Sequence, residues 1–189
     1  MTIELIQNLF EEYEAVRSYL VDQGELTFAS DVQGIVPKVL LLASASYFEA
    51  AITGLIVNYY KLKLGDEDVG VTFVQLKALK RQFHTLFQWN AANVNHFWSF
   101  FGPNFKQYAS DIVANDQELR DDARAFLELG NLRNELVHEN YMAFVLEKTS
   151  QEVFDLAFRA NRFVDRLPEL LAGYAEPGPA GTGAADPAD

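Results

Sequence analysis

The sequence predicts an all-α protein, a helical bundle of four to five long helices. Apolar side chains recur at three- and four-residue steps over most of the 189 residues, and no segment shows the alternating pattern of a strand. Hydrophobic residues make up 49% of the chain, which is enough for one well-filled core. The length is that of a single domain, and we expect this domain to span residues 1–173.

The first two predicted helices lie between residues 3 and 65. Apolar residues spaced by three and four, with glutamates between them, mark an amphipathic helix that ends at Gly24. Residues 31–34 resemble a turn, and Pro37 suits the first turn of a second helix that continues to Leu64. This second helix is apolar on nearly every side, so we expect it at the centre of the bundle. Charged residues interrupt its apolar stretch, which indicates a buried helix rather than a membrane span.

The second half of the chain continues the helical pattern. A third helix is expected over residues 72–89, followed by a short aromatic segment and a short helix over 105–113. Asp116 is placed to cap a long helix that runs to His138. The final helix is expected over residues 151–171, and a proline near its end should kink or terminate it.

Composition excludes several kinds of site. Cysteine is absent, so there is no disulfide, thiolate nucleophile or cysteine-ligated metal, and the three histidines share no short ligand spacing. We therefore expect no metal and no cofactor. The net charge of −12 opposes general attraction to phosphate backbones, so nucleic acid would have to bind in a local basic cleft. The N-terminus lacks signal-peptide features, which favours a cytoplasmic protein, and residues 174–189 are expected to form a disordered tail.

One cluster near the end of the helix that stops at His138 can carry chemistry. Arg133, Asn134 and His138 bring a guanidinium, an amide and an imidazole into six consecutive positions. Histidine can accept or donate a proton near neutral pH, and a guanidinium can stabilise the charge that develops on a phosphate in its transition state. The asparagine can orient the imidazole or bind phosphate or ribose. These groups suit RNA cleavage without a metal ion.

This Arg-x4-His pattern, with Asn directly after Arg, resembles the signature of the HEPN superfamily, whose members are mostly all-α, metal-independent ribonucleases. A long apolar helix with an internal Glu49 precedes the motif, as in RiboL-PSP-type and related prokaryotic HEPN proteins. The resemblance covers residues 1–172 and implies a HEPN-like bundle. It also implies an endoribonuclease that cleaves by 2′-OH transesterification at a composite active site between the two chains of a homodimer.

The resemblance also implies roles for individual residues. His138 would act as general base or acid, Arg133 would stabilise the scissile phosphate, and Asn134 would position substrate or imidazole. Glu49 would orient Arg133, because an unpaired carboxylate in an apolar helix is costly. The biological role would be that of a toxin or defence effector, with an antitoxin or defence-complex protein as a further partner. Other substrate contacts are expected from Tyr141 and from a basic helix face formed by Lys77, Lys80 and Arg81.

Other interpretations remain open. The chain could be a non-catalytic HEPN module that binds nucleotide, RNA or a partner protein, which its acidic composition favours. It could also be a structural or adaptor protein, in which Arg133 and His138 point apart into solvent. In that case Arg133 would form an ordinary salt bridge, and His138 would only interact with the carbonyl groups at the C-terminal end of its helix. A second basic stripe lies on the last helix and is formed by Arg159, Arg162 and Arg166. The two other histidines, His84 and His96, are expected to pack in aromatic surroundings or to cap a helix.

Overall fold

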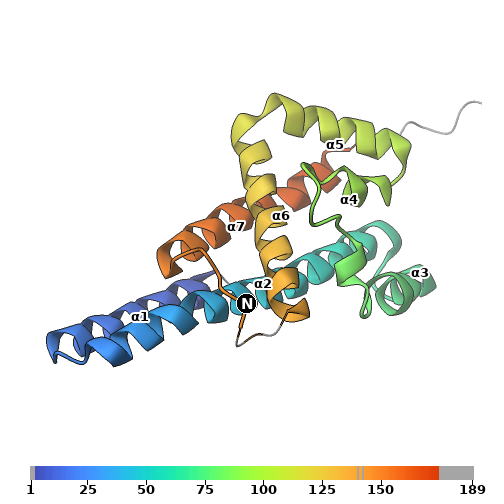
Figure 1. Cartoon of the computed structure of the whole chain (residues 1–189). Coiled ribbons are helices and arrows are strands. Elements are labelled where there is room, and N and C mark those ends of the chain that lie inside the picture. The colour runs from blue at the N-terminus through green and yellow to red at the C-terminus, as the bar shows by residue number, and fades with distance from the viewer. Residues whose placement is uncertain (1–2, 140, 142, 175–189) are drawn as a thin grey trace, which may run out of the picture.

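The computed structural model describes residues 3–139, 141 and 143–174, and within them the protein is helical and has no strand (Figure 1). Five helices have 13 residues or more, which confirms the predicted bundle, and two have only five. The expected tail lies outside the described residues, apart from Tyr174. The α-helices are α1 (Glu4–Asp22), α2 (Leu26–Leu64), α3 (Val69–Phe73), α4 (Asn95–Ser99), α5 (Pro103–Asn115), α6 (Gln117–His138) and α7 (Ser150–Ala172).

The central helix, α2, is longer than the sequence predicted. It runs without a break through 39 residues, so the turn expected at residues 31–34 is wrong and Pro37 lies inside the helix. Proline removes one backbone hydrogen bond from a helix, a cost that burial can offset. Pro37 and its neighbours Val36 and Leu40 are buried, and α1 packs along this half of α2. Tertiary packing therefore keeps the chain helical where local signals favour a turn.

The predicted helix over residues 72–89 is correct only as far as Leu79 and is wrong beyond it. After α3 the chain makes a π-helical turn, η1 (Val74–Leu79), and later a short 3₁₀ turn, η2 (Phe83–Thr85). The backbone is extended at Lys80 and left-handed at Arg81, where φ is 62°. Leu79 and Leu86 are buried on either side of this change, so the core holds both ends of an irregular segment. As a correction, Lys77, Lys80 and Arg81 do not share one face of a regular helix.

The core lies where α6 and α7 pack together and against α2. Its largest fully buried side chains include Phe48 of α2, Trp98 of α4, Phe126 of α6 and Phe163 of α7. Aromatic rings from these elements meet edge to face, as between Phe48 and Phe126, whose ring centroids are 5.8 Å apart. The core therefore fixes α6, which carries the Arg-x4-His motif, against the wall of α2.

Capping fixes where the last two helices begin. The Asp116 carboxylate accepts a hydrogen bond from the backbone N–H of Leu119, as predicted, and α6 starts at the next residue. Thr149 and Glu152 form a reciprocal capping box at the start of α7. The termination expected at Pro168 does not occur, because α7 continues to Ala172.

The hairpin of α1 and the first half of α2 extends away from the other helices, to the lower left of Figure 1. Large apolar side chains are exposed along it, among them Tyr19, Leu26 and Phe28. By length and composition alone, α2 is apolar enough to cross a membrane, a test that the core helix of a bundle also passes. Its buried side chains pack against α1, α6 and α7.

Candidate functional site

The motif residues Arg133, Asn134 and His138 line one cavity of about 500 Å³. Its floor is formed by α2, one wall by α6, and the opposite wall by residues 81–89. We call this space the motif cavity and the stretch from Lys80 to Trp89 the 80–89 segment. The cavity is the place where the described part of the chain brings these three side chains together.

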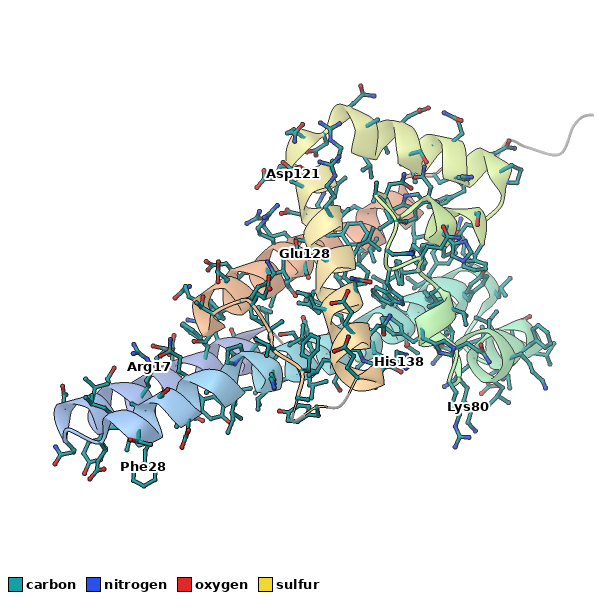
Figure 2. The ribbon with its side chains drawn as sticks, in the orientation of Figure 1. Arg17, Phe28, Lys80, Asp121, Glu128 and His138 are labelled. Carbon is teal, nitrogen blue, oxygen red and sulfur yellow. The ribbon has the colours of Figure 1, made fainter. Side chains whose placement is uncertain are left out.

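Both reactive side chains of α6 reach this cavity although they are five residues apart. A five-residue step turns about 140° around a helix, so the two do not share one helix face. His138 is the last residue of α6 and is exposed, while Arg133 is half-buried one turn earlier. Figure 2 shows His138 at the end of α6, with Lys80 on the segment to its right. A cavity that wraps around the end of α6 therefore accommodates both residues.

The guanidinium of Arg133 is not neutralised by a carboxylate among the described residues. Its Nη1 donates a hydrogen bond to Oδ1 of Asn134, at 3.1 Å. Of the acidic residues near it on α6, Glu128 pairs with Lys148 at 2.7 Å. Glu135 accepts a hydrogen bond from Asn131 instead. Arg133 is therefore positioned by its neighbouring amide and keeps its charge available for an anion.

The ion pair expected between Glu49 and Arg133 is not formed, although both line the motif cavity. The reason is that the Glu49 side chain is exposed, so water solvates its carboxylate and no partner is required. Among the described residues that line the cavity, Glu49 is the single acidic side chain, opposed by Arg81 and Arg133. The cavity is thus locally basic in a protein of net charge −12.

Beyond Lys80 and Arg81, which were expected to contact substrate, the sequence did not single out the 80–89 segment as part of the site. Arg81, His84 and Trp89 all line the motif cavity. Of these, His84 was expected only to pack or cap, whereas its side chain is exposed at the cavity. The Trp89 ring packs against Gly130, where an added Cβ would overlap the ring. A glycine in the interior of a helix often marks a place where another element packs closely against the backbone. Gly130 was therefore the sequence signal that could have located this segment beside α6.

A second, more open hollow continues from the motif cavity along α2, and we call it the basic hollow. It shares Glu49 and Arg81 with the motif cavity and adds Lys61 and Lys80. Lys61 lies 3.5 Å from the carboxylate of Asp66, both on exposed side chains. Lys80 and Arg81 form no ion pair in the described part of the chain. The two spaces adjoin at Glu49 and Arg81, and we call them together the groove.

Other expected substrate contacts lie away from this groove. Lys77 is exposed and lines neither space. Tyr141 also lines neither; the Nζ of Lys38 donates to its carbonyl oxygen at 3.0 Å and lies 5.1 Å from its ring centroid. Of the basic residues predicted as substrate contacts, Arg81 lines both spaces, Lys80 lines only the basic hollow, and Lys77 lies outside both.

The basic stripe of α7 binds the protein's own carboxylates. Arg162 donates two hydrogen bonds to the buried Asp122, at 2.8 and 2.6 Å, and these raise the pKa of its guanidinium. Arg159 lies 3.8 Å from the same carboxylate, and Arg166 pairs with Asp116 and Glu169. The stripe is therefore paired within the protein, and its ion pairs with Asp116 and Asp122 hold α7 to α6.

The remaining histidine, His96, has a structural environment. Its Nε2 lies 3.3 Å from the carbonyl oxygen of Thr85, and its ring meets Phe100 edge to face. In the neighbouring aromatic run, Phe97 and Trp98 are buried in the core while Phe100 is exposed. Among the described residues, no group of three or more histidine, aspartate or glutamate side chains is placed to hold a metal ion.

Comparison with known proteins gives one match. The sequence model of the RiboL-PSP-HEPN family matches residues 6–173, which is most of the chain and includes every element that lines the motif cavity. No curated protein and no solved structure matches the chain. The match covers both walls of the groove.

Proposed function

This chain belongs to the RiboL-PSP-HEPN family, and on that premise we propose that it is an endoribonuclease that cleaves RNA without a metal ion. Family membership supports a nuclease-like, RNA-related module in general. The observation that supports catalysis is the meeting of Arg133, Asn134 and His138 in one cavity, with the guanidinium unopposed by a carboxylate among the described residues. A structural protein with an accidental motif would not need these side chains to share a cavity.

The proposed reaction is an internal transesterification. A base removes the proton from the ribose 2′-OH, the 2′-oxygen attacks phosphorus, and the bond from phosphorus to the 5′-oxygen breaks as an acid protonates that oxygen. The products are a 2′,3′-cyclic phosphate and a free 5′-OH. His138 acts in proton transfer, Arg133 stabilises the charge that gathers on the phosphate oxygens, and Asn134 orients Arg133 through the hydrogen bond between them.

We include a homodimer in the proposal, in which two copies of the motif lie at a shared groove. The exposed apolar side chains of the α1–α2 hairpin offer surface that such an interface could bury. Within each groove, Lys80 and Arg81 would hold flanking phosphates, and Glu49 would limit how closely the phosphate approaches α2. Tyr141 would contact only RNA that extends beyond the cavity.

The biological role in this proposal is that of a cytoplasmic toxin or defence effector. An uncontrolled endoribonuclease harms the cell that makes it, so a partner protein that restrains it is part of the proposal. Expression of the chain alone should then arrest growth, and expression of the His138→Ala variant should not.

A second candidate function is a non-catalytic module that binds RNA, nucleotide or a partner protein. The net charge of −12 favours it, because the surface as a whole repels a polyanion and leaves only the groove to attract one. This candidate and the nuclease share the groove and differ in whether a bond breaks.

The test is incubation of the purified protein with total RNA in excess EDTA. His138→Ala and Arg133→Ala are compared with Arg124→Ala, which changes an exposed arginine of the same helix outside the groove. The nuclease is supported if the unmutated protein and Arg124→Ala cleave and the other two lose activity. If the folded, unmutated protein binds RNA without cleaving it, the binding module is the correct function.

A further inference from the structure

We infer that a cavity lined by aromatic rings, away from the motif cavity, holds an unpaired nucleotide of the RNA outside the cleavage site. The inference rests on the proposed endoribonuclease function. Residues near the end of α2 and around the start of α5 line this cavity of about 380 Å³, and none of them lines the groove. Cavities that bind small molecules usually measure about 300 to 1,000 Å³. We call it the aromatic pocket, and its aromatic side chains are Tyr59, Tyr60, Phe100, Phe101, Phe105 and Tyr174.

The rings of the aromatic pocket meet at steep angles. The ring planes of Tyr59 and Phe101 meet at 83°, with centroids 6.2 Å apart, and those of Tyr59 and Tyr60 meet at 78°. The ring of Phe100 meets His96 edge to face, at 75°. None of the ring contacts within the pocket, among the described residues, is a face-to-face stack. Rings arranged in this way form walls against which a planar base can stack.

Folding leaves these rings partly exposed to solvent. The Phe100 side chain is 54% exposed, and the rings that are half-buried are those of Tyr59, Tyr60, Phe101 and Tyr174. Several large apolar side chains exposed at one place usually mark a surface that a ligand or partner covers. Aromatic side chains stack with any nucleobase, because every base has a π-face. The pocket therefore suits an unpaired base of any identity.

The charge of the pocket favours a phosphate beside that base. No acidic side chain is among the described residues that line it, in a protein of net charge −12. Lys63 lines the pocket with an exposed side chain, and its Nζ lies 5.9 Å from the ring centroid of Tyr59. This ammonium forms no ion pair within the described part of the chain. A base on the rings and a phosphate at Lys63 are the two parts of one nucleotide, whereas an aliphatic ligand would leave the ammonium unmatched.

The start of α5 adds backbone donors to the same pocket. Gly102, the residue before α5, has no side chain to cap the helix, and Pro103 has no backbone N–H. Asn104 and Phe105 line the pocket, and no hydrogen bond from their backbone N–H groups is formed within the described residues. The N-terminal end of a helix attracts negative charge. It therefore adds to the positive potential that Lys63 supplies for a phosphate.

The aromatic pocket adjoins the groove along the last turns of α2. Asn58 and Lys61 line the basic hollow, and Tyr59 and Tyr60 of the same turns line the pocket. From Glu49, which lines the motif cavity, the helix rises roughly 16 Å to Tyr60. RNA that reaches the pocket must therefore extend beyond the scissile bond and follow the hollow. The path is the same when the scissile phosphate lies, as proposed, between the two chains of a homodimer.

The first experiment measures RNA affinity in the His138→Ala background, in which RNA is bound without being cleaved. Phe100→Ala removes an exposed ring, and Leu62→Ala is its matched control, because Leu62 is 80% exposed and lines neither the pocket nor the groove. For an unstructured dodecanucleotide we expect Phe100→Ala to weaken binding about tenfold, as for the loss of one stacked base. Leu62→Ala should leave the affinity unchanged, and Tm shows that both variants fold. Equal affinities of the two variants overturn the inference.

The second experiment varies the length of the RNA in the same background. A dinucleotide contains one scissile bond and is too short to reach from the motif cavity to the aromatic pocket. Its affinity should be the same with and without Phe100→Ala, and the difference should emerge as the RNA is lengthened to a dodecanucleotide. If Phe100→Ala weakens the dinucleotide as much as the dodecanucleotide, Phe100 does not act on a distant nucleotide and the inference is overturned.

The third experiment tests the phosphate contact through its salt dependence. Lys63→Gln should reduce the slope of log affinity against log salt for the dodecanucleotide by about 0.7, the value for one phosphate contact with a single strand. Lys77→Gln changes an exposed lysine that lines neither the pocket nor the groove, and it should leave the slope unchanged. An unchanged slope for Lys63→Gln would overturn the assignment of a phosphate to this pocket.

Cleavage by the protein with His138 intact separates this inference from the proposed nuclease. Phe100→Ala should raise KM for the dodecanucleotide about tenfold and leave kcat unchanged, because it removes binding that is equal in the ground state and the transition state. If the protein cleaves and Phe100→Ala has an unaltered KM, the pocket is overturned and the nuclease is supported. If the dodecanucleotide binds with the expected loss in Phe100→Ala but is never cleaved, the nuclease is overturned and the pocket is supported.

Discussion

The indole of Trp89 occupies the space in which a side chain at Gly130 would lie. This contact joins the irregular 80–89 segment to the helix that carries Arg133 and His138, and both elements line the motif cavity. The shape of the cavity therefore depends on a glycine that itself takes no part in proton transfer.

Replacement of this glycine should separate the two walls. Gly130→Ala places a methyl group inside the Trp89 ring, so we expect a lower Tm and a loss of RNA cleavage, although alanine favours helix over glycine by about 1 kcal/mol. Gly34→Ala is the matched control, because an added Cβ there meets nothing within 4 Å and position 34 is also helical. Equal gains in Tm for both variants would contradict the proposed role of the contact.

The charge of Arg133 should not be sufficient for activity. Arg133→Lys keeps the positive charge and loses the planar pair of donors that can bind two phosphate oxygens, so we expect kcat to fall by about a hundredfold. Arg124→Lys, on an exposed part of α6, should leave kcat unchanged. Steady-state cleavage of a short RNA measures both, and normal activity of Arg133→Lys would reduce its role to charge alone.

Stability should depend on the buried Asp122 far more than on its neighbour Asp121. Asp122 has a side-chain exposure of 5% and accepts both hydrogen bonds from Arg162, so Asp122→Asn should cost about 2 kcal/mol of unfolding free energy. The Asp121 side chain, 38% exposed, pairs with Arg124 at 3.4 Å, and Asp121→Asn should cost less than about 0.5 kcal/mol. Urea unfolding at neutral pH measures the difference, which would vanish if the α6–α7 ion pairs did not contribute.

The pH dependence of stability should show the environment of Asp165. Burial raises the pKa of this carboxyl, while the hydrogen bond from Asn161 acts in the opposite direction. A raised pKa in the folded state means that the contribution of this group is fully present below the usual carboxyl range and is lost as pH rises through the raised value. Asp165→Asn mimics the protonated form, so its advantage in unfolding free energy should grow between about pH 4 and pH 7. A constant difference across that range would argue against the shift.

The basic hollow should contribute to the salt dependence of RNA binding. In a His138→Ala background, which binds without cleaving, Lys80→Gln should reduce the slope of log affinity against log salt by about 0.7, the value for one phosphate contact with a single strand. Lys77→Gln changes an exposed lysine outside the groove and should leave the slope unchanged. Equal slopes for both variants would place the RNA elsewhere.

The regular helices were predictable because their signals are local. Three- and four-residue periodicity located α1, α5, α6 and α7 to within a few residues, and Asp116 marked the start of α6. The start of α2 and the break after Leu79 were not predictable. In both places the decisive contacts are tertiary: Pro37 is buried in the bundle, and the segment after Leu79 is held by side chains remote in sequence.

The candidate site was predictable to the same extent. Arg133, Asn134 and His138 are close in sequence, so their spacing could be recognised directly. His84 comes from an irregular segment whose path depends on packing against Gly130, and a single sequence contains no spacing rule for it. The ion pairs of Arg159 and Arg162 could not be predicted either, because their partner Asp122 lies on another helix.

The order in which α2 and its packing partners are made has a consequence for biogenesis. The ribosome completes this long apolar helix well before it reaches α6 and α7, which later cover much of it. Until then the nascent chain exposes hydrophobic surface, so a chaperone that binds exposed hydrophobic segments should engage it early. The cavity cannot assemble before α6 emerges, so premature stops upstream of Gln117 should yield aggregation-prone fragments that lack the cavity.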